Sequence, residues 1–206
     1  MGEATMFRTI STAILPGLLV IGVAALAQEA VPARIRGTIV GIDKQALTVT
    51  AKTGETEIVM LKPDAMVSEV VATKLSDIKP NSFVGVTAMP GVGGAMTAVE
   101  VHIFPEAMRG TGEGHRPWDL GAGSTMTNGT VGTVSGTGDR TITVKYGTEE
   151  KTVSVPETAP IVSFQPGSRA ELVKGAHVII FAQKAPDGTL SAARVSVGKD
   201  GLTPPM

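Results

Sequence analysis

Cysteine is absent from this chain of 206 residues, so the protein has no disulfide, no thiolate metal ligand and no cysteine nucleophile. Aromatic residues make up only 3% of the chain, and the core must therefore be built from Val, Ile, Leu, Ala and Met. Basic residues give no excess of positive charge: 18 of them stand against 19 acidic residues, for a net charge of −1. This balance excludes the basic surface with which proteins neutralise phosphates, so nucleic acid is not an expected partner.

Glycine and proline are abundant, with 25 and 13 residues, and they favour short strands separated by turns over long helices. Runs of β-branched or alternating apolar residues predict the strands. These runs are 37–43, 46–52, 56–61, 82–89 and 95–103, followed by 129–135, 140–146, 150–155, 161–164, 176–184 and 189–197. The segment 67–79 is more mixed, and we expect a short strand and one helical turn there. The sequence thus predicts an all-β fold.

The first 27 residues have the pattern of a secretory signal peptide. Residues 13–27 form a short apolar run, Arg8 precedes it, and Ala25-Leu26-Ala27 provides the small residues of a cleavage site. The run is shorter than the roughly 20 residues that cross a bilayer, which favours cleavage after Ala27 over retention as an anchor helix. No later segment is long and apolar enough to span a membrane. We expect a periplasmic or secreted protein that begins at Gln28.

The remaining chain contains an internal repeat. Five short segments of the first half recur in the same order about 94 residues further along, which indicates duplication of a whole domain. The matched segments are 37–39 with 129–131, 47–49 with 142–144, 58–60 with 153–155, 77–81 with 171–175, and 94–98 with 188–192. Each unit holds a three-strand meander, an irregular crossover and a final hairpin, which describes a small barrel similar to an OB-fold.

The predicted organisation follows from this repeat. Two homologous OB-like barrels occupy 28–104 and 128–198, and a long ordered connector at 105–127 joins them. The tail, 199–206, is expected to be flexible. Each unit has about 70 residues, close to the smallest size at which one core is adequate, so we expect the two barrels to pack together.

The connector has no counterpart in the repeat, and long loops inside compact proteins are usually functional or disordered. It contains the only tryptophan, Trp118, which we expect to fill a gap between the barrels. Arg109 and Arg116, with nearby carboxylates, are expected to hold the connector in place through salt bridges. Its five glycines indicate disorder or unusual backbone angles.

A metal site at the connector is the alternative interpretation. Imidazole and carboxylate groups suit zinc or manganese, and the candidate ligands are Glu100, His102, Glu106, Glu113, His115 and Asp119. In the strand that ends at Ile103, alternation assigns Val99, Val101 and Ile103 to the core face. Glu100 and His102 then point together toward whatever covers the sheet. The spacing of the six residues matches no known ligand motif.

The repeated motifs resemble those of a bacterial family. They read Gly-Thr-Ile/Val, Leu/Ile-Thr-Val, Leu-x-Asp-Ile-Lys-Pro and Gly-x-Met/Leu-x-Ala, and they are similar to motifs of a widespread family of exported β-barrel repeat proteins of unknown function. The connector, with HIFPEAMRGTGEGHRPWDL at 102–120, is similar to that of two-repeat members. The resemblance implies barrels and export, and no established activity. Some relatives carry metal-transport labels, but the hydropathy of this chain excludes a permease.

Catalytic motifs are not recognised: the sequence has neither a Gly-x-Ser-x-Gly elbow nor a His-Glu-x-x-His helix. The sequence therefore favours a non-catalytic binding or structural module without a cofactor, whose partner is an envelope protein or a small ligand. One alternative is a periplasmic accessory protein that binds a divalent metal. A further alternative is a hydrolase that uses a carboxylate pair in the connector, such as Glu106 with Asp119.

Overall fold

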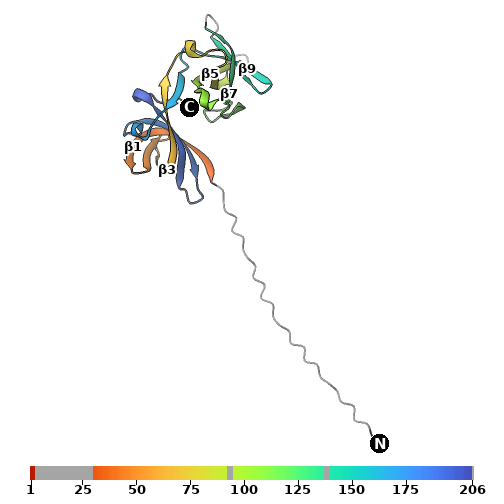
Figure 1. Ribbon diagram of the computed structural model, residues 1–206, viewed down its shortest axis with the longest axis vertical. Coiled ribbons are helices and arrows are strands. Elements are labelled where there is room, and N and C mark those ends of the chain that lie inside the picture. The colour runs from red at the N-terminus through yellow and green to blue at the C-terminus, as the bar shows by residue number, and fades with distance from the viewer. Residues whose placement is uncertain (3–29, 92–94, 137–139, 206) are drawn as a thin grey trace.

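The structure is a computed structural model that describes residues 1–2, 30–91, 95–136 and 140–205. The predicted signal peptide, apart from its first two residues, lies outside the described residues. The chain forms two lobes of β-strands that meet at a waist (Figure 1). Within the described ranges the helical segments are 3-10 turns of three residues, so the predicted all-β class is confirmed. The same ranges contain no helix long and apolar enough to cross a membrane.

Five strands close the first barrel. They are β1 (Val31–Asp43), β2 (Ala46–Ala51), β3 (Thr56–Ala72), β11 (His177–Lys184) and β12 (Leu190–Gly198). The pairing runs β12-β11-β1-β2-β3, and β12 closes the ring by pairing in parallel with β3. In β2, Leu47 and Val49 are buried, and Thr48 and Thr50, which alternate with them, are partly exposed, as expected for a strand with one face on a core.

Five other strands close a second barrel in the same way. They are β4 (Phe83–Pro90), β5 (Met96–Ile103), β7 (Thr125–Ser135), β8 (Thr141–Tyr146) and β9 (Glu149–Ser154). The pairing runs β5-β4-β7-β8-β9, and β9 pairs in parallel with β5. Val86, Val101 and Val144 are among the fully buried residues of its core.

Each barrel therefore combines a meander from one half of the chain with a hairpin from the other half. Strands β1–β3 are completed by the hairpin β11–β12, and strands β7–β9 by the hairpin β4–β5. This pairing differs from the predicted domains, 28–104 and 128–198, in which each half closes its own barrel. The physical reason is that the two hairpins carry similar apolar patterns, so the sequence pattern alone does not show which hairpin completes which meander.

Two crossover segments join the barrels at the waist. The second half of β3 pairs antiparallel with β10 (Ile161–Pro166), with Val70 opposite Phe164. The turn η1 (Leu75–Asp77) contributes Leu75 to the second core, and the segment after η4 (Arg169–Glu171) contributes Leu172 to the first core. A third cluster, which includes Val70 and Phe164, fills the space between the two barrel cores.

The C-terminal tail is more ordered than expected. After β12 the turn η5 (Lys199–Gly201) reverses the chain, and Leu202 packs against the third cluster. Pro204 is buried. The prediction of a flexible tail at 199–206 did not anticipate these contacts, because the apolar surface that receives Leu202 is created only when β3 and β10 pair.

Candidate functional site

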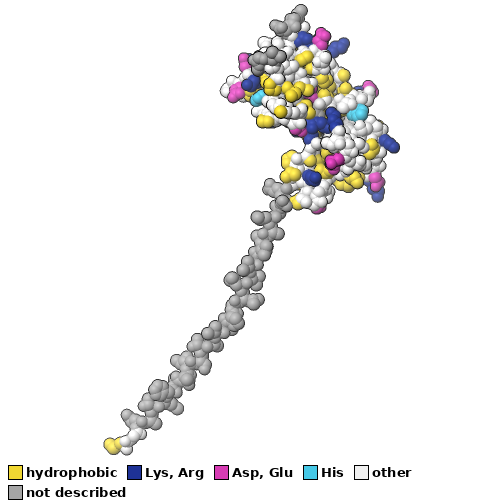
Figure 2. Space-filling model, turned by 180° about the vertical axis from the view of Figure 1, so that it is seen from behind, with side chains coloured by type: hydrophobic (Ala, Val, Ile, Leu, Met, Phe, Trp, Pro, Cys, Tyr) yellow, Lys and Arg dark blue, Asp and Glu magenta, His cyan; other side chains and the backbone are white. Residues whose placement is uncertain are grey.

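A cavity of about 250 Å³ lies where the two barrels and the connector meet. Lysine and arginine side chains gather at this waist in the space-filling view (Figure 2). The walls come from β1, β3, β11 and β12 of the first barrel, from β5 and β7 of the second, from β10, and from the connector. The cavity is thus formed by segments that are far apart in the sequence.

The first barrel presents a row of three side chains across neighbouring strands. Arg194 on β12 pairs with Phe181 on β11, which pairs with Arg34 on β1. The Arg194 guanidinium lies 3.8 Å from the centre of the Phe181 ring, and that of Arg34 lies 5.6 Å from it. Both distances are within the range of cation–π attraction. In the next row Ser196 Oγ lies 2.9 Å from Ser68 Oγ on β3.

The second barrel presents different chemistry in the corresponding rows. Glu100, opposite Thr87, is fully buried, and the Thr87 hydroxyl donates to its Oε1 at 3.2 Å. His102 is 2% exposed, and its Nδ1 lies 3.3 Å from the same carboxylate oxygen. The imidazole stands over Gly85, where a Cβ atom would lie 2.0 Å from Nε2, so this row requires glycine. Asn128 completes the row on β7 and is 4% exposed.

A β-bulge corrects one predicted facing in β5. The pairing register shifts opposite Thr87 and Ala88, which turns Ala98 and Val101 into the core and leaves Val99 37% exposed. The prediction that Val99 faces the core was therefore wrong, because a bulge inserts one residue and interrupts simple alternation. Glu100 and His102 do point away from that core, and they are buried at the waist.

The connector closes the cavity from the side. It contains η3 (Glu106–Met108) and β6 (Gly114–Pro117), and β6 pairs with β7. Trp118 follows β6, and its ring lies 4.0 Å from the Arg34 guanidinium and 5.5 Å from that of Arg116. Each of the five connector glycines has a positive φ, between 56° and 145°, a backbone region that favours glycine.

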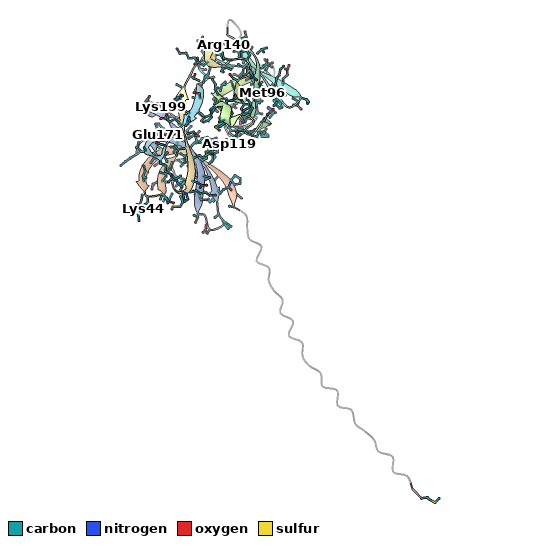
Figure 3. All side chains as sticks on the ribbon, viewed as in Figure 1. Lys44, Met96, Asp119, Arg140, Glu171 and Lys199 are labelled. Carbon is teal, nitrogen blue, oxygen red and sulfur yellow. The ribbon has the colours of Figure 1, made fainter. Side chains whose placement is uncertain are left out.

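Salt bridges from Asp119 hold the connector at one end, and a hydrogen bond from Arg109 holds it at the other. Asp119 binds Arg34 at 2.7 Å and Arg36 at 2.8 Å, and it lies between the two lobes (Figure 3). Partial burial alone would raise the pKa of Asp119, but hydrogen bonds and charge from Arg36 and then Arg34 bring it below its usual value. At the other end Arg109 pairs with Glu106 and donates to the Asn81 carbonyl at 2.8 Å.

The six candidate metal ligands are mostly separated. The structure brings Glu100 and His102 together, while each of the other four has its own partner. These contacts are Glu106 with Arg109, Glu113 Oε1 with the Gly147 amide at 3.2 Å, His115 Nδ1 with Thr127 Oγ1 at 2.8 Å, and Asp119 with Arg34 and Arg36. In the part of the chain that the structure describes, no three His, Asp or Glu residues are grouped to hold a metal ion. Burial lowers the pKa of His115, followed by repulsion from Lys151.

Several polar groups at the cavity lack partners. Arg34 Nε, Trp118 Nε1 and Asn128 Oδ1 are buried and make no hydrogen bond to any described residue. Arg194 contacts the Phe181 ring, and within the described part of the chain it has no carboxylate partner. Burial lowers the pKa of Arg116 and of Arg194, and repulsion from Arg34 adds to each shift. The cavity therefore combines aromatic walls with cationic and polar groups that are not neutralised.

A larger hollow of about 740 Å³ lies between η1, β10 and the second barrel. It is more open to solvent, and none of the unpartnered buried polar atoms of the described residues lines it. The waist cavity is the more specific site. Comparisons with models of known protein families, with curated proteins and with solved structures give no match.

The site contains connector residues that stand out in the sequence and strand residues that do not. Trp118, Arg116 and His102 line the cavity. Arg34, Phe181, Asn128 and Arg194 also line it and were not singled out. The available signal was the predicted repeat, in which Arg194 takes the position of Glu100, so that the charge is reversed between the two positions.

Proposed function

We propose that the protein is a non-catalytic binding module that holds a small ligand in the cavity at its waist. The observation that carries this proposal is the set of buried polar atoms without partners at Arg34, Trp118 and Asn128. A buried polar group that lacks a hydrogen bond costs about 1–3 kcal/mol. A ligand that supplies these partners recovers that cost, so the cavity favours occupation by a polar molecule.

The remaining walls suit the ring of a planar ligand. Phe104 and Phe164 are stacked with centroids 5.6 Å apart, and His102 meets Phe104 edge-on at 4.7 Å. Met108 and Met126 complete this wall with flexible, polarizable side chains. Ligand sites are typically apolar clefts with a few placed polar groups, and a volume of about 250 Å³ accommodates one or two fused rings.

Binding without catalysis is supported by the arrangement of the buried histidine. Glu100 contacts His102 at Nδ1, which leaves Nε2 as the atom that a general base would use. Nε2 lies over the backbone of Gly85, and among the described residues it makes no hydrogen bond to Ser68 or Ser196. Glu106 and Asp119 are each bound to arginines, which does not favour the carboxylate-pair hydrolase.

The proposal also includes two homologous OB-like units. We number the three strands of each meander one to three and the two strands of each hairpin four and five. Both barrels then have the order 1-2-3-5-4, and in both strands three and five are parallel, as in OB-folds. The waist pairings recur 94 residues apart: Ser196 lies opposite Ser68, and His102 lies opposite Val162 (196 − 102 and 162 − 68). These registers support duplication followed by exchange of the hairpins.

Export of the mature chain from Gln28 is part of the proposal and is supported by the apolar run at 13–27. Expression with the leader in a Gram-negative host, followed by intact-mass analysis of the periplasmic fraction, tests it. The expected mass is that of a chain cleaved after Ala27. Cytoplasmic protein that retains residues 1–27 would contradict export.

Binding at the waist can be followed at a single probe, because Trp118 is the only tryptophan and its indole N–H gives one resolved amide-type signal in 15N–1H spectra. A neutral planar compound, 2-naphthol, is added to the full chain. We expect a saturable shift of the Trp118 signal. Thr111→Phe, at an exposed cavity-lining position, should abolish the shift, while Thr53→Phe, in the β2–β3 turn, should not. An unmoved signal in every protein would refute ligand binding in the cavity.

A further inference from the structure

The cavity contains an alternating ladder of cations and aromatic rings. Its members are, in order, Arg194, Phe181, Arg34, Trp118 and Arg116, and the successive distances from guanidinium to ring centre are 3.8, 5.6, 4.0 and 5.5 Å. All of these groups line the same cavity. The ladder joins the first barrel to the connector.

Stacking fixes these guanidinium groups without using their hydrogen-bond donors. The N–H groups of arginine lie in the plane of the guanidinium, so an aromatic ring on its face leaves the planar fork free to bind a carboxylate. Arg194 stacks on Phe181 and has no carboxylate partner among the described residues. Arg34 Nε is buried without a hydrogen bond. The Nε–H of Arg34 is thus held in place without a hydrogen-bond partner among the described residues, and the Arg194 guanidinium is held in place without a carboxylate partner there.

Positive charge at the ladder exceeds the negative charge that the chain provides. Arg34, Arg116 and Arg194 all line the cavity, and Asp119, which binds Arg34, is the carboxylate in contact with the ladder among the described residues. Arg116 donates instead to the Gly112 carbonyl at 2.7 Å. The repulsion that Arg34 exerts on the other two arginines is relieved when an anion enters.

We propose that the ligand is a planar organic acid, an aromatic carboxylate, with its carboxylate at Arg194 and Arg34 and its ring against Phe104 and Phe164. This inference rests on the proposed function, because it names the chemical class of the molecule bound at the waist. The stacked phenyl rings, 5.6 Å apart, supply the apolar wall. At that end Asn128 Oδ1 accepts a hydrogen bond from a ring hydroxyl where the acid carries one.

A matched pair of compounds tests the charge of the ligand. 2-Naphthoate and 2-naphthamide have the same ring and nearly the same shape, and only the first is an anion. Isothermal titration of the full chain should show 2-naphthoate binding at least about tenfold more tightly. Arg194→Gln should remove most of this difference, because it weakens binding of 2-naphthoate more than binding of 2-naphthamide. Lys174→Gln, which removes one exposed charge at a position that does not line the cavity, should keep the preference.

The outcomes separate the two proposals. Equal affinities, with the Trp118 signal still shifted by both compounds, would overturn the anion inference and leave the binding function standing. Absence of heat and of any Trp118 shift would overturn both. If Arg194→Gln melts before the titration temperature, Arg194→Lys provides the test, because it retains the charge but lacks the planar fork. A full preference for 2-naphthoate in Arg194→Lys would contradict the role given to the fork.

Discussion

A pair of cysteines placed across β1 and β11 would test the exchange of hairpins directly, because the chain contains no other thiol. Val31 lies opposite Lys184 in the observed pairing. If each half closed its own barrel, Val31 would instead lie opposite Pro90, the residue 94 positions before Lys184 (184 − 94). Antiparallel partners have Cα atoms about 4.5–5.5 Å apart, within the range that a disulfide spans.

The structure sets the expected size of the effect. A disulfide between Val31→Cys and Lys184→Cys closes a loop of about 150 residues and removes chain entropy worth about 5 kcal/mol from the unfolded state. Intact-mass analysis of the monomer should show the loss of two hydrogens, and guanidinium unfolding should show the oxidised form to be more stable than the reduced form. Strain in the bond would reduce the gain.

The control pair, Val31→Cys with Pro90→Cys, should remain reduced in the monomer. A disulfide in this control, together with free thiols in the Val31→Cys/Lys184→Cys protein, would refute the exchange. Covalent dimers of the Val31→Cys/Pro90→Cys protein would also contradict the exchange, because they would show that β1 pairs with the β4–β5 hairpin of another chain.

Three further predictions concern the waist and the barrels. Because the folded-state pKa of Asp119 is lowered, its contribution to stability is present above about pH 4 and is lost as pH falls through that folded pKa. Asp119→Asn should therefore cost at most about 1 kcal/mol in urea unfolding at pH 7 for this half-exposed group, and the cost should shrink as the pH is lowered through the folded pKa. A cost that does not change on acidification would contradict the ion pair. Gly37→Ala and Gly129→Ala would each place a Cβ 2.2 Å from a backbone oxygen, so both should lower the free energy of unfolding by about 1–3 kcal/mol; a neutral effect at either position would argue against their equivalence. Gly85→Ala should destabilise by a similar amount through its clash with His102, and the cost should shrink in a His102→Ala background, which a double-mutant cycle measures.

Local sequence patterns predicted where most strands lie, because most of them carry their own alternation and are bounded by turn residues. The strands β1 and β3 extend beyond the predicted runs 37–43 and 56–61, and β6 was not predicted. The run 46–52 corresponds to Ala46–Ala51, and 176–184 corresponds to His177–Lys184. The partners of the strands were not predicted, because they depend on which of two similar hairpins completes each meander. The bulge at Val99 was missed for a related reason: it is created by the pairing of β4 with β5 and has no mark in the alternation of β5 alone.

The difference between local patterns and strand pairing also explains which site residues could be predicted from the sequence. Trp118 and Arg116 stood out because they belong to the unrepeated connector. Arg34 is one charged residue in an ordinary strand, and it approaches Phe181 and Arg194 only because β11 of the second half pairs with β1 of the first. The exchange of hairpins is thus also what assembles the ladder, and a site made in this way is not visible in any single segment.

A crystal structure of the full chain with bound 2-naphthoate would locate the binding site directly. We predict the naphthalene ring in the waist cavity against Phe104 and Phe164, with the carboxylate within hydrogen-bond distance of Arg194 or Arg34. A structure with the compound bound elsewhere and the cavity unchanged would contradict the central claim that the two barrels and the connector together form the binding site.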